Sequence, residues 1–213
     1  MASVWAVIVA AGSGDRFGAA KQYAQLAGRT VLAHAAAAAR SSCDGVIVVV
    51  PAGDEDRPEV RAVGADRVVA GGATRTASVR SGLAAVPGDA DIVVVHDAAR
   101  PLAAPELFAT AIAAVRAGAD GAVCALAVTD TIKRVAGDTI VATIDRADLV
   151  AVQTPQAFRV DALRRAHAAG AEATDDAALV EAGGGKVVVV PGHATNIKLT
   201  AAADLALAER WLR

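Results

Sequence analysis

The sequence predicts an α/β protein with a doubly wound, mostly parallel β-sheet, and two observations lead to this prediction. Short runs of β-branched and apolar residues recur along the chain, without the polar alternation of a sheet that faces water. Alanine-rich helical stretches separate these runs, so strand and helix alternate over most of the 213 residues. A chain of this length can bury one sizeable core, so we expect a single domain over residues 1–213.

The individual elements follow from these runs. The expected strands lie at residues 4–10, 45–50, 67–70, 91–97, 121–128 and 186–192. The expected helices lie at residues 30–40, 74–85, 105–117, 160–169, 175–182 and 201–212. Pro105 suits the first turn of its helix and Gly118 suits the end of the same helix. Ligands of such sheets bind beyond the carboxyl ends of the strands, so we expect the site there.

Residues 129–146 interrupt the alternation of strand and helix. Two short β-runs flank the turn Ala136-Gly137-Asp138, which predicts a hairpin. The segment is too polar for a central strand pair, and an isolated two-stranded hairpin is marginally stable in water. We therefore expect an arm at about residues 129–150 that packs on something else, such as a second subunit.

Composition excludes several classes of protein. The net charge is −2, from 21 Lys and Arg against 23 Asp and Glu, so nucleic acid is not an expected partner. Cys43 and Cys124 lie far apart without a C-x-x-C motif, which argues against a disulfide framework or a zinc site. No signal-peptide pattern precedes the first strand and no apolar run is long enough to span a membrane. We expect a cytoplasmic protein without a membrane partner.

The stretch "VIVAAGSGDRFGAAKQY" combines a strand end with two glycines and two cations, Gly12, Gly14, Arg16 and Lys21. Backbone N–H groups in such a turn can form a nest for phosphate oxygens, and the cations supply charge. An ordinary strand-to-helix turn with solvated cations explains the spacing equally well. Neither the dinucleotide fingerprint nor the P-loop is present, because Phe17 stands where each motif needs a glycine. A nucleotide bound here would be held in a third way.

Nine segments extend over nearly the whole chain: "AAGSGDRF" (10–17), "KQY" (21–23), "GGATRTASV" (71–79), "VHDAARP" (95–101), "DTIK" (130–133), "IDR" (144–146), "QTPQAF" (153–158), "TDDA" (174–177) and "NIKLT" (196–200). Together they resemble the cytidylyltransferases of the non-mevalonate isoprenoid pathway, which join CTP to 2-C-methyl-D-erythritol 4-phosphate. The resemblance implies a Rossmann-like nucleotidyltransferase fold and a magnesium ion. It also implies a homodimer in which the 129–150 arm reaches the partner's site.

The resemblance implies roles for the residues that would meet CTP. Both reactants are anions, so positioning and charge neutralisation should dominate catalysis. The implied catalytic residues are Arg16, Lys21 and Lys198. The implied nucleotide-binding residues are Ala10, Ala11, Gly12, Gly14, Arg16, Lys21, Gly72, Ser78 and Asp97. Asp97 is also the implied metal ligand, since Mg²⁺ accepts one or two carboxylates together with phosphate oxygens.

Some of these residues also fit ordinary structural roles. Asp97 at a strand end can instead cap the following turn, Ser78 can be a helix serine, and Lys198 can be a solvated lysine at a strand end. We expect His96 and Arg75 to be structural, and Thr154 to be a loop hydroxyl.

A second implied set would bind the methylerythritol phosphate: Arg100, Thr131, Arg146, Thr174 and Lys198. Arg146 could instead form a surface salt bridge with Asp145 or Asp148, which would contribute little. Thr174 could instead be the N-cap of a helix with an acidic first turn.

Two alternative functions remain open. A cytidylyltransferase for another polyol phosphate, such as ribitol 5-phosphate, would share most of these motifs. A non-catalytic nucleotide-binding homologue is favoured only by the short link between Arg16 and Lys21, at residues 17–20, where the family usually has about two more residues and a proline. Because the sequence ends at Arg213, we expect no fused second enzyme of the same pathway.

Overall fold

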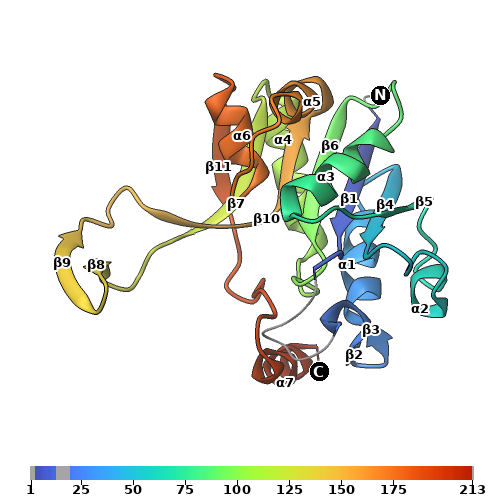
Figure 1. The fold of residues 1–213 in the computed structure, drawn as a ribbon, viewed down its shortest axis with the longest axis horizontal. Helices are drawn as coiled ribbons and strands as arrows, with labels where there is room; N and C mark the ends of the chain where they lie inside the picture. The colour runs from blue at the N-terminus through green and yellow to red at the C-terminus, as the bar shows by residue number, and fades with distance from the viewer. Residues whose placement is uncertain (1–2, 13–19, 213) are drawn as a thin grey trace.

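The structure is a computed structural model that describes residues 3–12 and 20–212. Its centre is a seven-stranded sheet with the strand order β11-β7-β10-β6-β1-β4-β5 (Figure 1). The strands are β1 (Val4–Val9), β4 (Gly45–Val50), β5 (Arg67–Ala70), β6 (Ile92–Asp97), β7 (Gly121–Ala127), β10 (Val150–Arg159) and β11 (Val187–Pro191). All neighbouring pairs are parallel except those of β10, which runs antiparallel to β6 and β7. The predicted fold class is confirmed.

Helices cover both faces of this sheet because its strands are apolar on both sides. The helices are α1 (Val31–Arg40), α2 (Pro58–Arg61), α3 (Arg75–Ala84), α4 (Pro105–Arg116), α5 (Val160–Ala168), α6 (Asp176–Ala182) and α7 (Ala202–Trp211). Helices α1 and α4 pack on the face that carries Ala6 and Ile8 of β1. Helices α3, α5 and α6 pack on the opposite face, which carries Val7. This alternation along β1 divides the core into two layers.

A smaller cluster lies beside the carboxyl edge of the sheet. It packs α7 against the short strand β2 (Gln25–Leu26) and the start of α1. The 3₁₀ helix η2 (Lys21–Tyr23) precedes β2, and the short strand β3 (Arg29–Thr30) pairs with it. The buried members of the cluster are Leu26, Val31, Leu199 and Ala208. No helix in residues 3–12 and 20–212 is long and apolar enough to cross a membrane.

The predicted strands and helices agree with the structure to within one residue at each end. Strand β10 was not predicted, although it lies between β6 and β7 in the sheet. Its segment "QTPQ" is polar and contains Pro155, which cannot donate to a sheet ladder. The pairing with β7 is indeed irregular between Val152 and Gln156, and the Thr154–Pro155 peptide bond is cis.

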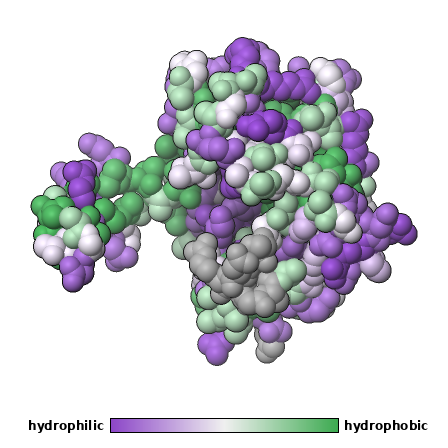
Figure 2. Space-filling model, in the orientation of Figure 1, coloured by the Kyte–Doolittle hydropathy of each residue, from purple (hydrophilic) through white to green (hydrophobic). Residues whose placement is uncertain are grey.

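The predicted hairpin is present as β8 (Ile132–Ala136) and β9 (Thr139–Ile144), which pair antiparallel around Gly137 at φ 60°. The hairpin projects far from the body of the molecule (Figure 1). Several of its apolar side chains face solvent, including Val135, Ile140 and Val141 at 57%, 60% and 55% exposure. Figure 2 shows this apolar surface along the arm and at its junction with the body.

Candidate active site

A cleft of about 530 Å³ lies at the carboxyl ends of β1 and β6, where ligands of such sheets bind. We call it the first cleft. The backbone after β1 forms one wall, at residues 9–12, and the loop before α3 forms another, at residues 72–75. Lys21, Ser78, Asp97 and Lys198 also line the first cleft.

Glycines bring the walls of the first cleft close together. A Cβ on Gly71 would lie 2.3 Å from the Cβ of Ala11, and a Cβ on Gly72 would lie 2.5 Å from the Cβ of Ala77. The Ser78 hydroxyl accepts a hydrogen bond from the Gly72 N–H at 3.1 Å and donates to the Thr74 carbonyl oxygen at 2.9 Å. Ser78 therefore braces the loop as a buried helix residue, while the backbone of that loop faces the cleft.

Asp97 ends β6 and holds two cations. Its Oδ1 accepts from Arg75 Nε at 3.2 Å, and its Oδ2 accepts from Lys198 Nζ at 2.7 Å. Burial alone would raise the pKa of Asp97, but Arg75 and Lys198 outweigh burial and hold that pKa below its ordinary value. Asp97 is therefore an anion in a site where cations predominate, as binding of phosphates requires.

The loops that carry Lys21 and Lys198 are tied to each other and to the sheet. Lys21 Nζ donates to the Leu199 carbonyl oxygen at 2.9 Å, which joins η2 to the loop of Lys198. Asn196 in the same loop is fully buried, and its Nδ2 donates to the Thr154 carbonyl oxygen at 2.9 Å. These bonds place both lysines beside the first cleft.

A second cleft, of about 570 Å³, meets the first at Arg75, Asp97 and Lys198. Arg100 and Thr174 line it, together with polar residues of β10 and α6. Arg100 is fixed by a hydrogen bond of 2.6 Å from its Nη1 to the Asn196 carbonyl oxygen. Three valines that face solvent also line this cleft, Val150, Val152 and Val189, at 44%, 41% and 56% exposure.

Most of the predicted site residues lie at these two clefts. The first cleft contains Ala10, Ala11, Gly12, Lys21, Gly72, Ser78, Asp97 and Lys198, and the second contains Arg100, Thr174, Asp97 and Lys198. Gly14 and Arg16 lie outside the described residues.

The two predicted site residues on the arm are not brought into this arrangement. Neither Thr131 nor Arg146 is among the described residues that line either cleft. Within the described chain, Arg146 donates to the Thr129 carbonyl oxygen rather than pairing with Asp145 or Asp148.

Two of the sequence interpretations need correction. Thr154 is a buried residue of β10, not a loop hydroxyl, because its Oγ1 accepts from the Asp97 N–H at 3.0 Å. The N-cap of α6 is Asp175, whose Oδ1 accepts from Ala178 N, and not Thr174. Arg75 pairs with Asp97 and Asp176, as expected of a structural residue, and it also lines both clefts. Its signal in the sequence is a cation at the first residue of a helix that follows a glycine pair.

His96 has the structural place expected of it. It is fully buried, and burial lowers its pKa to about 4. Its Nε2 donates to the Arg100 carbonyl oxygen, so its Nδ1 accepts from the Thr154 hydroxyl at 3.1 Å. Neutral His96 thus links Asp97, Thr154 and Arg100 beneath the site.

A glycine-lined cleft beside clustered cations and one carboxylate, at the carboxyl edge of a parallel sheet, defines an α/β protein that binds phosphorylated ligands. The model of the IspD family, 2-C-methyl-D-erythritol 4-phosphate cytidylyltransferase, matches residues 4–213. The chain belongs to this family.

Individual relatives agree with this assignment. A 2-C-methyl-D-erythritol 4-phosphate cytidylyltransferase of Rubrobacter xylanophilus is 43% identical, with 100% of this chain and 96% of that protein covered. The crystal structure of the enzyme of that name from Thermus thermophilus has a TM-score of 0.82 and 39% identity, covering 99% of this chain and 98% of that chain. A bifunctional enzyme IspD/IspF of Clavibacter michiganensis is 49% identical over 95% of this chain. The chain spans about half the length of that relative, 53%.

Proposed function

We propose that this protein transfers a cytidylyl group from CTP to 2-C-methyl-D-erythritol 4-phosphate. A phosphate oxygen of the methylerythritol phosphate attacks the α-phosphorus of CTP. The bond from that phosphorus to the bridging oxygen breaks in line, and pyrophosphate leaves. The product is 4-diphosphocytidyl-2-C-methyl-D-erythritol. The observation that carries this proposal is the meeting of the two clefts at Arg75, Asp97 and Lys198, where two bound phosphates would come together.

The first cleft suits CTP. Its glycine-lined backbone near Gly72 offers hydrogen-bonding groups to the base and ribose, and Lys21 and Lys198 offer positive charge to the triphosphate. The short link before Lys21 does not keep this residue away from the cleft, which favours an active enzyme over a non-catalytic homologue. In the second cleft, Arg100 would bind the substrate phosphate and Thr174 a hydroxyl of the polyol.

The protein residues of this site would hold a magnesium ion together with the phosphates of a bound nucleotide, but not by themselves. In the described part of the chain, no three His, Cys, Asp or Glu side chains cluster to hold an ion by themselves. Asp97 is one carboxylate at the meeting point of the clefts, and Mg²⁺ often binds through one carboxylate and the oxygens of substrate phosphates. Bound there, the ion would neutralise charge on the phosphates, with Asp97 as its protein ligand.

A homodimer is part of the proposal. The 129–150 arm exposes apolar side chains, and the Thr131 and Arg146 that it carries do not line their own chain's clefts. A second copy would bury the apolar surface and bring these two residues to the partner's second cleft. We also propose a cytoplasmic location, in keeping with the free thiols of Cys43 and Cys124.

The test is pyrophosphate release from CTP and Mg²⁺, with methylerythritol phosphate and ribitol 5-phosphate offered separately. Release with methylerythritol phosphate alone is the expected result. Release only with ribitol 5-phosphate would assign the second cleft to another polyol. Absence of release with either, from protein that still binds CTP, would overturn the proposal in favour of a non-catalytic homologue.

A further inference from the structure

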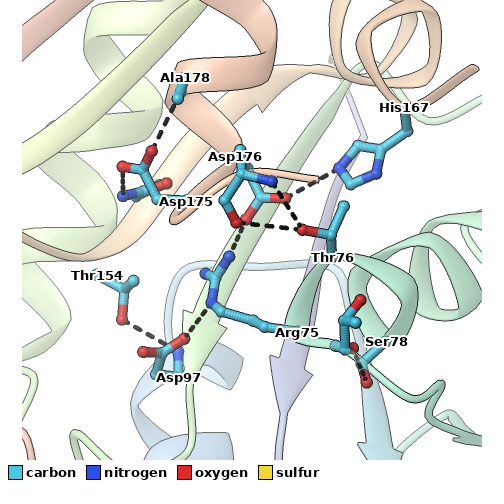
Figure 3. Close-up of polar contacts among 12 residues, drawn as sticks. Arg75, Thr76, Ser78, Asp97, Thr154, His167, Asp175, Asp176 and Ala178 are labelled. Carbon is cyan, nitrogen blue, oxygen red and sulfur yellow. Dashed lines mark hydrogen bonds and ion pairs between the residues drawn. The ribbon is translucent and has the colours of Figure 1, made fainter. Parts of the chain in front are cut away.

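A line of polar contacts runs from α5 and α6, which pack on the same face of the sheet as α3, to the meeting point of the two clefts (Figure 3). His167 Nε2 lies 2.9 Å from Asp176 Oδ1. Asp176 Oδ2 accepts from Arg75 Nη1 at 2.8 Å, and Arg75 Nε donates to Asp97 Oδ1 at 3.2 Å. Helices α5 and α6 are thereby connected through Arg75 to the carboxylate at the site.

The inner end of this line is fully buried. His167 and Asp176 are 3% and 1% exposed, and neither is among the described residues that line a cleft. The side chain of Arg75 is 25% exposed and lines both clefts. The side chains of His167 and Asp176 therefore do not line either cleft, and their hydrogen-bonded connection to the site passes through Arg75.

The guanidinium group of Arg75 is held by two of its three nitrogens. Nε and Nη1 are bonded to Asp97 and Asp176, whereas Nη2 makes no hydrogen bond to a residue that the structure describes. Guanidinium groups match phosphate geometry, and a fixed one loses little freedom when it binds an anion. Arg75 thus presents a fixed donor where the two clefts meet.

We propose that Arg75 is a further catalytic residue that donates from Nη2 to a phosphate oxygen at the junction of the clefts, and that Asp176 and His167 are its positioning residues. This inference rests on the proposed cytidylyl transfer. Negative charge grows on the phosphate oxygens during that transfer, and preorganised donors stabilise such charge most effectively. Lys198, by comparison, is a point charge held by one contact to Asp97, with a side chain that is 42% exposed.

The first experiment compares Arg75→Ala and Arg75→Lys with the wild-type protein in pyrophosphate release, with and without millimolar guanidinium. We expect kcat to fall on the order of 10²-fold in Arg75→Ala, and guanidinium to restore a measurable part of it. Arg75→Lys should regain little, because a lysine cannot make the three contacts. The control is Arg165→Ala on α5, which removes an exposed ion pair with Asp161 and should neither lose activity nor respond to guanidinium.

The second experiment tests the positioning residues by a double-mutant cycle. Asp176→Asn alone should lower kcat about tenfold and change the KM for CTP little, since it removes the charge of one of the two carboxylates that orient Arg75. In the Arg75→Ala background the same change should have no further effect on kcat. His167→Gln, which can still donate to Asp176, should retain more activity than His167→Ala.

The outcomes separate this inference from the proposed function. A wild-type protein without turnover would refute the proposed function itself. An active wild-type protein with a folded Arg75→Ala variant that keeps its kcat, or that guanidinium does not rescue, would overturn the catalytic role of Arg75. Additive losses in the cycle would overturn the positioning role of Asp176.

Discussion

The two clefts share three charged residues but differ in how they are built. The first is walled by the backbone of one chain, with Gly72 braced by the buried Ser78. The second has an exposed valine wall, and the arm residues expected to complete it lie in a hairpin that points away from the body (Figure 1). The backbone walls of the first cleft fit a site that one chain forms alone, and the exposed valine wall of the second cleft fits the proposal that a second copy completes it.

The largest effect is expected at Asp97, because it belongs to both clefts. Asp97→Asn keeps the shape of the side chain but removes the charge that holds Arg75 and Lys198 and that would bind magnesium. We expect kcat to fall on the order of 10²- to 10³-fold in steady-state pyrophosphate release. The matched control is Asp91→Asn just before the same strand, where the carboxylate accepts from Ser3 N away from both clefts. Full turnover in a folded Asp97→Asn variant would contradict the assignment of Asp97.

A smaller effect, confined to the second cleft, is expected at Arg146. Arg146→Ala removes a charged donor, so the KM for methylerythritol phosphate should rise about tenfold while the KM for CTP stays nearly constant. Arg134→Ala is the control, since Arg134 is also an exposed residue of the arm. An equal rise in the KM for both substrates would show that Arg146 does not act specifically on the second cleft.

Mixing two variants would show whether Arg146 acts across a dimer. If the arm acts across a dimer as proposed, Asp97→Asn would damage the site of its own chain and Arg146→Ala would damage the site of the partner. A mixed dimer should therefore contain one intact site, and an equal mixture should recover about a quarter of the wild-type sites. No recovery after subunit exchange would argue that each arm serves its own chain.

The fold could be predicted from the sequence because buried parallel strands read as continuous apolar runs. Residues 45–50 and 92–95 are examples, and every residue of the two strands that contain them is buried. Strand β10 could not be predicted, since its central residues are polar side chains that bond to other loops rather than to a hydrophobic layer. Whether such a segment forms a strand is determined by its contacts with distant parts of the chain and not by its own sequence pattern.

The site residues that could be predicted are those that lie in short sequence motifs of the family. Lys21, Asp97 and Lys198 come from segments far apart in the chain, and the resemblance to a family placed them together before the structure did. Arg75 shows the limit of this approach. Its orientation at the clefts depends in part on Asp176, which lies 101 residues away and bonds to it through a contact of the fold that no local spacing encodes.

The smallest effect is expected at Ser78, which belongs to the first cleft alone. Ser78→Ala removes the acceptor for Gly72 N, and a hydrogen bond of this kind contributes about 0.5–1.5 kcal/mol. The KM for CTP should rise about two- to tenfold while the KM for methylerythritol phosphate stays unchanged. Ser81→Ala on the same helix is the control, since its hydroxyl donates within the helix, to the Ala77 carbonyl oxygen. If only the KM for methylerythritol phosphate rose, the assignment of CTP to the first cleft and of methylerythritol phosphate to the second would have to be reversed.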